Sequence, residues 1–193
     1  MQKTAITSAE IAPVLAERWS PRAFDESYVA TQHELLSILE AGRWAPSAMN
    51  VQPWRFSAAK RRSELFGKIA NHLGGFNASW SPKAAAYVVV SAFTNGDSGQ
   101  PGTTSQFDAG IATAQILIQA EGLGLHGHVM GGIDHVALHT ELGYPENLAV
   151  LVVIAIGKGA PAELLEGGAY DREVAMRSRL PLDEIVLHGL PNA

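Results

Sequence analysis

The chain of 193 residues contains no cysteine. This absence excludes disulfide bonds, zinc sites built from thiolates, iron–sulfur clusters and a cysteine nucleophile. Basic residues are also scarce, with 14 Lys plus Arg against 19 Asp plus Glu and a formal net charge of −5. Because non-specific nucleic-acid binding needs a basic face, we expect no nucleic-acid partner.

Long hydrophobic runs are missing as well. The longest, residues 148–156, is far too short to cross a bilayer, and residues 1–7 lack the apolar core of a signal peptide. We therefore expect a cytoplasmic protein without a membrane partner. What the sequence does contain is a hydrophobic fraction of 47%, which is typical of a globular protein with a substantial core. Its length predicts a single domain over residues 1–193.

The scarcity of positive charge makes the positions of the arginines informative. No Lys or Arg occurs between Lys83 and Lys158, so a phosphate site would take its charge from the two ends of the sequence. Residues 18–24 read RWSPRAF, and residues 177–181 read RSRLP. Each is a pair of arginines with a hydroxyl between them, a pattern that suits bidentate binding of an anion.

Local patterns predict helices and strands along the whole chain. Capping-box spacing at residues 7–10 and 31–34 predicts two helix starts, with the first helix running to Arg18 and the second stopping at Pro46. Further helices are predicted over residues 62–72, 106–121 and 134–142, and strands over residues 54–58, 84–93, 125–130 and 149–156. The intermingled elements indicate an α/β or α+β protein with a sheet of about four or five strands covered by helices.

Two segments need separate comment. The predicted helix over residues 106–121 is almost wholly apolar, so it is buried in the core or in a subunit interface. Residues 122–127 read GLGLHG, which matches the text of a dinucleotide-binding fingerprint. That site requires a strand before the glycines and a helix after them, whereas here a predicted helix precedes and a predicted strand follows. We therefore interpret the segment as a helix end followed by a tight turn.

Four of the seven histidines fall close together, at His126, His128, His135 and His139. The first two would share one strand face and the last two one helix face, and both spacings suit metal ligation. No carboxylate completes a His-Glu-x-x-His helix. A metal-dependent protein built on this cluster is one alternative, and surface or hydrogen-bonded histidines without a metal are the other, which we favour.

Four segments, in this order and spacing, are considered together: residues 18–24, residues 46–54 (PSAMNVQPW), residues 122–132 and residues 177–182. Together with FDAGIA at residues 107–112, they resemble the FMN-dependent nitroreductase family over nearly the whole chain. The resemblance implies an α+β fold with a central, mainly antiparallel sheet flanked by helices. It also implies an intertwined homodimer with FMN at the interface, contacted by both subunits.

The resemblance places the arginines on the flavin. Arg18 and Ser20 would hold the ribityl phosphate region, and Arg177 and Arg179 would add charge around the phosphate. Arg22 would approach N1 and O2 of the ring, where a cation stabilises the negative charge gained on reduction.

Two other segments would contact the ring. Residues 46–50 would reach the partner subunit's flavin, and Met130 and Gly131 would direct a backbone hydrogen bond towards flavin N5. The cofactor-binding residues implied by the resemblance are Arg18, Trp19, Ser20, Arg22, Pro46, Ser47, Ala48, Asn50, Met130, Gly131, Arg177 and Arg179.

The implied activity is that of an NAD(P)H oxidoreductase that reduces nitroaromatics, quinones or an activated alkene by a ping-pong mechanism. No side chain need act as acid or base, because the flavin carries the chemistry. A flavin-binding or flavin-modifying protein of the same fold, without nicotinamide turnover, is an alternative. Whether Asn77 or Lys83 touches the flavin, and whether residues 94–104 gate the site, stay open at this point.

Overall fold

The computed structural model describes residues 3–94 and 102–189. Its centre is a four-stranded sheet in the order β1-β2-β4-β3, with every neighbouring pair antiparallel. The strands are β1 (Trp54–Lys60), β2 (Ala86–Phe93), β3 (His126–Met130) and β4 (Leu148–Gly157). The predicted α+β class with a mainly antiparallel sheet is therefore confirmed.

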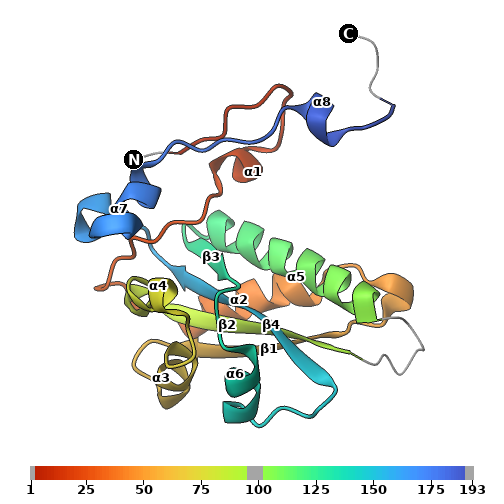
Figure 1. Ribbon diagram of the computed structural model, residues 1–193, viewed down its shortest axis with the longest axis vertical. Helices are drawn as coiled ribbons and strands as arrows, with labels where there is room; N and C mark the ends of the chain where they lie inside the picture. Colours follow the sequence, from red (N-terminus) through yellow and green to blue (C-terminus); the bar gives the residue numbers. More distant parts are fainter. Residues whose placement is uncertain (1–2, 95–101, 190–193) are drawn as a thin grey trace.

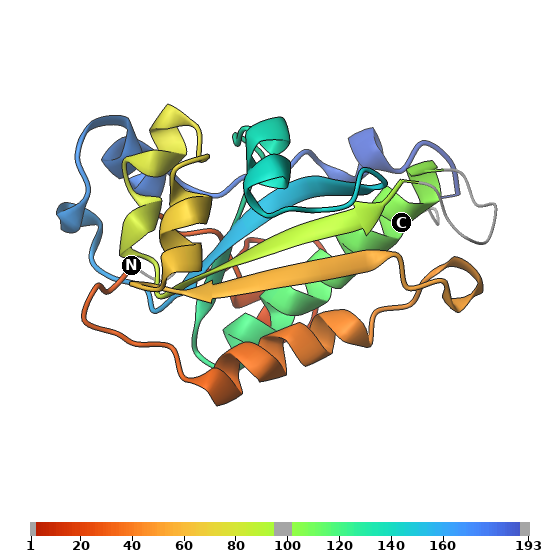
Figure 2. The same cartoon turned by 90° about the horizontal axis from the view of Figure 1, so that it is seen from below.

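Helices cover both faces of the sheet (Figure 2). The long helices α2 and α5 lie on one face, and α3 and α6 lie on the other. β2 is buried throughout its centre, which confirms the strand predicted to be covered on both sides. The helices are α1 (Pro13–Glu17), α2 (Gln32–Arg43), α3 (Glu64–Ala70), α4 (Gly75–Ala78), α5 (Gly102–Gly122), α6 (His135–Glu141), α7 (Gly167–Val174) and α8 (Leu182–Ile185), with short 3₁₀ turns η1 (Ala48–Asn50), η2 (Ser81–Lys83) and η3 (Ala162–Leu164).

The helix predicted to begin at Thr7 is wrong, because α1 begins only at Pro13. A helix capped at Thr7 would place Pro13 in its interior, where the missing N–H and the ring clash cost about 3 kcal/mol. At the first helical position the same proline is favourable. The preceding residues run back along the helix instead, and the Ala5 N–H donates to the Ala16 carbonyl at 2.8 Å.

The second capping box is confirmed. The Glu34 N–H donates to Thr31 Oγ1 at 3.1 Å, and the Thr31 N–H donates to the Glu34 carboxylate at 2.7 Å. Elsewhere the boundaries moved: α5 begins at Gly102, before the predicted start at residue 106. Sequence periodicity also missed α7, whose N-cap Glu166 makes no side-chain cap hydrogen bond and so carries no start signal.

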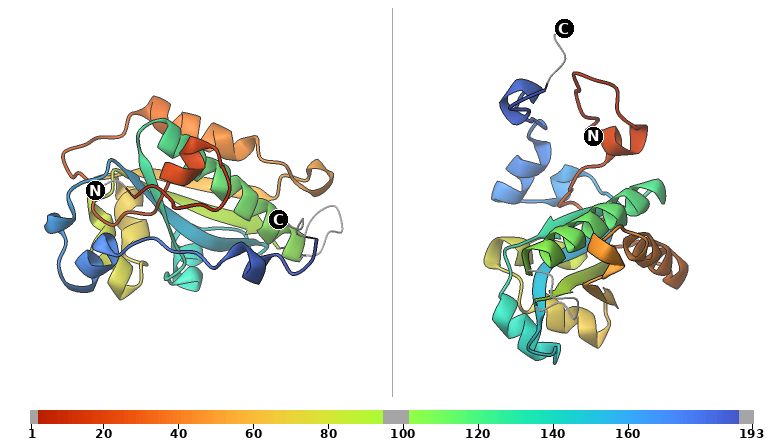
Figure 3. Two further views of the ribbon diagram at one scale, coloured as in Figure 1. Left: turned by 90° about the horizontal axis from the view of Figure 1, so that it is seen from above. Right: turned by 90° about the vertical axis from the view of Figure 1, so that its right-hand side faces the viewer.

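The first and last described segments of the chain lie side by side, above the sheet and its covering helices in Figure 1 and in the right-hand view of Figure 3. We call residues 3–17 and 175–189 the terminal arms. Arg177 joins them, since its Nη1 donates to the carbonyls of Lys3 and Ala16. The arms expose several large apolar side chains, namely Ile6, Ile11, Leu15, Met176, Leu180, Leu182, Ile185 and Leu187. Within the described ranges, none of the helices has the length and apolar character needed to span a membrane.

Gly157, at the end of β4, lets Phe24 pack against the sheet. Phe24 is 1% exposed, and a Cβ on Gly157 would lie 2.8 Å from Phe24 Cδ1 and 3.2 Å from the backbone nitrogen of Ala85. We expect Gly157→Ala to lower the free energy of unfolding by about 1–3 kcal/mol, because the backbone contact cannot move aside. Urea denaturation measures the loss. Gly67→Ala in α3, whose new Cβ meets nothing within 4 Å, is the matched control and should not destabilise the protein.

Candidate functional site

The two arginine motifs meet in one cavity of about 210 Å³, which we call the arginine pocket. It lies between the segment after α1, the helix α7 and the start of the C-terminal arm. Its lining residues are Lys3, Arg18, Trp19, Ser20, Arg22, Arg172, Ala175, Met176, Arg177 and Arg179. The two ends of the sequence thus come together, as the distribution of charge predicted. Lys3 and Arg172 were missed, because neither belongs to a motif.

The cations of the arginine pocket repel one another. Burial lowers the pKa of Arg18, and Arg179 lowers it further, while Glu121 opposes the shift. Burial likewise lowers the pKa of Arg177, with Arg18 and Arg179 adding to the effect. A bound anion would relieve this repulsion and replace the lost hydration, so the pocket is suited to a group of high negative charge such as a phosphate.

Arg22 lines this pocket and carries a buried donor without a partner. Its Nε is one of three buried side-chain nitrogen or oxygen atoms, among the residues that the structure describes, without a hydrogen-bond partner. Its guanidinium carbon lies 5.8 Å from the centre of the Phe76 ring, and that of Arg172 lies 4.2 Å from the same ring. Because an unpaired buried donor is costly, a ligand acceptor at this point would stabilise the site.

The backbone around Arg22 is held from two sides. The carboxylate of Glu173 accepts from the N–H of Arg22 at 2.7 Å and from the N–H of Ala23 at 3.2 Å. Nδ1 of His128 lies 2.8 Å from the Pro21 carbonyl oxygen. Both Glu173 and His128 are buried. No sequence motif marks Glu173, since its partners are distant in the chain.

His128 makes stability depend on pH. Burial lowers the pKa of His128 from 6.5 to about 4. The hydrogen bond with Pro21 opposes this shift, and the positive charge of Arg22 adds to it. The unfolded chain therefore takes up the proton first, so this contribution is complete above pH 6.5 and is lost as the pH falls towards 4.

We expect wild-type protein to lose about 2 kcal/mol of unfolding free energy from this residue between pH 7 and pH 5. His128→Asn keeps a donor but does not titrate, so it should remove that part of the loss. Urea denaturation at the two pH values gives the difference, with the exposed His33→Asn as control. The same pH dependence in wild type and His128→Asn would contradict the assignment.

The predicted segment 46–50 lies elsewhere. The turn η1 is at the end of the molecule opposite the N-terminus (Figure 2), away from the arginine pocket. Met49 and Asn50 have positive φ, and the Ala48 N–H donates to the Asp108 carboxylate at 3.2 Å. A single chain therefore does not bring Pro46, Ser47, Ala48 or Asn50 to the arginines, and their place on a partner's ligand stays a prediction.

Met130 is the last residue of β3 and is buried in the core, and Gly131 follows the strand and is exposed. Asn77 lies beside them, because its Nδ2 donates to the Gly132 carbonyl at 3.0 Å. Phe76 touches the arginines and Asn77 touches Gly132, so α4 connects the arginine pocket to the end of β3. Lys83 makes a different contact, since its Nζ donates to the Leu164 carbonyl oxygen at 3.2 Å.

The four clustered histidines separate into individual hydrogen bonds. They pair through a ring nitrogen with the Glu121 carboxylate or with the carbonyls of Pro21, Val150 and Pro145. Among the described residues, no three His, Cys, Asp or Glu side chains are grouped to hold a metal ion. The geometry gives no support to the metal-dependent alternative based on His126, His128, His135 and His139.

Two smaller questions from the sequence have different outcomes. The segment GLGLHG is a helix end and a turn, as predicted, with α5 ending at Gly122, φ of +71° at Gly124 and β3 following. The open question whether residues 94–104 gate the site falls largely on residues 95–101, which lie outside the described residues.

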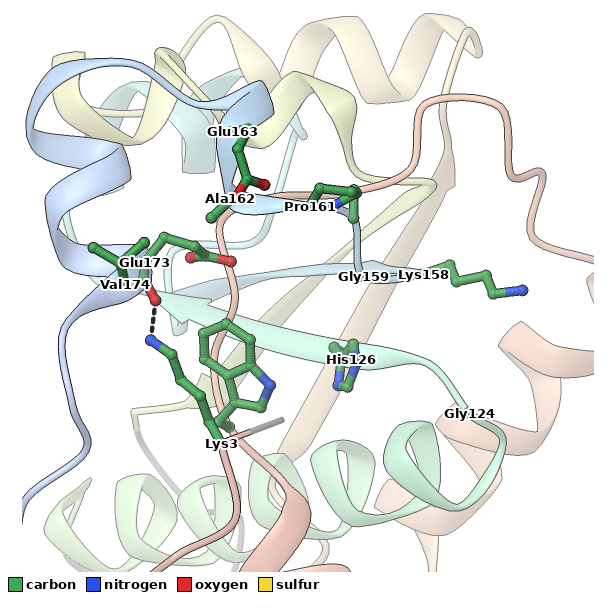
Figure 4. Close-up of a pocket in the computed structure, with 12 residues that line it drawn as sticks. Lys3, Gly124, His126, Lys158, Gly159, Pro161, Ala162, Glu163, Glu173 and Val174 are labelled. Atoms are coloured by element: carbon green, nitrogen blue, oxygen red, sulfur yellow. Dashed lines mark hydrogen bonds between the residues drawn. The ribbon is translucent and has the colours of Figure 1, made fainter. Parts of the chain in front are cut away.

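A larger cavity, about 460 Å³, adjoins the arginine pocket (Figure 4). The two share Lys3 and Trp19, and Lys3 Nζ lies 4.5 Å above the centre of the Trp19 ring. Figure 4 also shows Glu173 on the wall of this cavity, with Lys3 bonded to its backbone oxygen. Lys3 and Trp19 thus line both spaces, whereas Glu173 lines the larger one.

Comparison with known proteins identifies relatives of this arrangement. The sequence model described as Nitroreductase family matches residues 15–90 and 74–158. A crystal structure described as an oxidoreductase containing FMN is 35% identical, superposes with a TM-score of 0.88, and shares 96% of this chain and 94% of its own. An Archaeoglobus fulgidus protein, named provisionally as an NADH dehydrogenase/NAD(P)H nitroreductase, is 32% identical over 77% of this chain and 84% of its own length.

A third relative matches more locally. The oxygen-insensitive NADPH nitroreductase of Helicobacter acinonychis is 39% identical over 77 residues. This match covers 40% of the present chain but only 36% of the Helicobacter protein.

Proposed function

Since the chain belongs to the nitroreductase family, we propose that it is an FMN-dependent NAD(P)H oxidoreductase. Its acceptors would be nitroaromatics, quinones or similar small oxidised molecules. The observation that carries the proposal is the arginine pocket, a cavity with five arginines in a chain that has few basic residues. The related structure described as containing FMN supports the choice of cofactor.

The residues present fit the phosphate end of FMN. Arg18, Arg177 and Arg179 would neutralise the phosphate, and the Ser20 hydroxyl would add a donor. Nη1 of Arg177 donates to two backbone carbonyls, those of Lys3 and Ala16, which fixes the side chain against the N-terminal arm. Prior fixing lowers the entropy lost when the anion binds.

Arg22 fits the other end of the same ligand. We place its guanidinium, which lines the arginine pocket, beside N1 and O2 of the ring. A small rotation of the side chain would bring its buried and unpaired Nε to an acceptor. Bound FMN supplies the chemistry, which is acceptance of a hydride from reduced nicotinamide and transfer of the electrons to an acceptor. The positive charge of Arg22 would favour reduction, because the ring gains negative charge. One binding place used in turn by the two substrates gives ping-pong kinetics.

We also propose that the active unit is a homodimer. The segment of residues 46–50 lies far from the arginine pocket of its own chain, so its Ser47 and Asn50 would complete the site of a partner. The exposed apolar side chains of the terminal arms, together with Phe107 of α5 at 70% exposure, offer surface for such an interface. Size-exclusion chromatography with light scattering measures the mass, and a monomer that turns over NAD(P)H would contradict this part.

The function is tested with protein purified and reconstituted with FMN. We expect a yellow protein that oxidises NADH or NADPH when a nitroaromatic or a quinone is supplied. Firm FMN binding without NAD(P)H oxidation would instead support the flavin-binding or flavin-modifying alternative. A colourless protein that neither takes up FMN nor oxidises NAD(P)H would refute the proposal.

A further inference from the structure

We propose that Glu173 is a positioning residue for Arg22, and that helix α7 thereby sets the charge presented to the flavin ring. The effect on the flavin rests on the proposed function, whereas the contact between Glu173 and the Arg22 segment does not depend on a bound cofactor. Glu173 would touch neither cofactor nor substrate. It would act through the backbone of the segment that carries Arg22.

The contact is specific in its geometry. One carboxylate oxygen of Glu173 accepts from the Arg22 N–H and the other from the Ala23 N–H, so two consecutive amides are bound by one side chain. Glu173 is 3% exposed, so water competes little for these bonds. Hydrogen bonds from amides to a buried carboxylate are about twice as strong as neutral ones.

The clamp fixes the direction in which the Arg22 side chain leaves the backbone. His128 holds the Pro21 carbonyl on one side of Arg22, and Glu173 holds the amides on the other. With the backbone fixed on both sides, the direction of the Arg22 Cα–Cβ bond is set, and each remaining side-chain torsion occupies staggered wells. Lys3 in turn binds the backbone oxygen of Glu173, which ties the N-terminal arm to the end of α7.

A second role for Glu173 has to be separated from this one. Its negative charge attracts Arg22 directly and would also act through space on a bound flavin. The two roles predict opposite signs for the reduction potential of bound FMN. Removing a negative charge near the ring makes reduction easier and raises the potential, whereas displacing Arg22 removes a positive charge from the ring and lowers it.

The test is the midpoint potential of FMN bound to Glu173→Gln. Glutamine has the same shape but only one acceptor oxygen, so one amide loses its partner. We expect a potential more negative than in wild type, in the direction produced by Arg22→Ala, and FMN binding weakened about tenfold. In the double variant Arg22→Ala/Glu173→Gln the potential should equal that of Arg22→Ala alone. A potential that rises, stays unchanged, or shifts additively in the double variant would overturn the inference.

Two further variants keep the test decisive. Glu173→Asp retains the charge but is too short to reach both amides, so positioning predicts a negative shift and a charge effect predicts none. Glu163→Gln makes the same chemical change at an exposed carboxylate beside the neighbouring cavity and should leave the potential unchanged.

Hydrogen exchange tests the clamp without a cofactor. In the free protein the amides of Arg22 and Ala23 should exchange slowly, and at least one should exchange faster in Glu173→Asp or Glu173→Gln. Equal exchange in all three proteins would overturn the inference even if FMN binds. If the wild type bound no FMN, the proposed function would fail, while this exchange measurement would still decide whether Glu173 holds the segment.

Discussion

Arg22→Ala should slow flavin reduction by NAD(P)H about 100-fold while weakening FMN binding only a few-fold. The guanidinium is placed where the ring gains charge on reduction, and a preorganised group of that kind is typically worth about 10²–10³ in rate. The phosphate contacts of the other arginines remain, so most of the binding energy is kept. Anaerobic stopped-flow absorbance measures the reduction rate, and fluorescence titration measures the FMN affinity.

Arg22→Lys is the matched control for this prediction. Lysine keeps a positive charge but loses the planar donor group and Nε. We expect it to recover a large part of the reduction rate, because charge is the main requirement at N1 and O2. Losses of rate and affinity of equal size in Arg22→Ala would show that this arginine serves binding alone.

The double variant Arg18→Ala/Arg179→Ala should weaken FMN binding about 10³-fold, which is the largest effect on affinity that we expect. Each arginine would contribute a charged hydrogen bond to the phosphate, worth about 1.5–3 kcal/mol. The two guanidinium groups also repel each other in the free protein, since Arg179 lowers the pKa of Arg18. Fluorescence titration with FMN gives the dissociation constants.

Riboflavin separates a phosphate effect from a general loss of structure. It has the same ring but no phosphate, so its weaker binding should change little in Arg18→Ala/Arg179→Ala. Arg179→Ala alone should reduce affinity more than reduction rate, the reverse of Arg22→Ala. The surface variant Arg43→Ala, which breaks an exposed ion pair with Glu40, should alter neither ligand. If FMN and riboflavin lost affinity equally, the arginines would not be holding the phosphate.

The sequence by itself determined the features that short-range physics controls. The Thr31 capping box needs only contacts three residues apart, so its pattern was sufficient. A continuous apolar run predicts the buried strand β2. The distribution of charge indicates that a phosphate site would use the arginine pairs near the two ends of the sequence. Local signals gave a wrong prediction where two of them conflicted. The capping pattern at Thr7 predicts a helix start, but the helix begins only at Pro13, because proline is unfavourable in a helix interior.

Only the tertiary structure decided which distant residues share a site. Arg22 and Arg177 line one cavity because the segment at Arg22 packs against α7 and the start of the C-terminal arm. The distribution of charge suggested that both arginine motifs serve one site, but not which side chains meet there. The position of Glu173 depends on the packing of α7 against the segment at Arg22. The sequence did not predict α7, because this helix has no capping signal at its start. The separation of residues 46–50 from the arginines was likewise a matter of packing. Local hydrogen bonds and periodicity depend on residues that are close in the sequence, whereas the site depends on contacts between segments far apart in the chain.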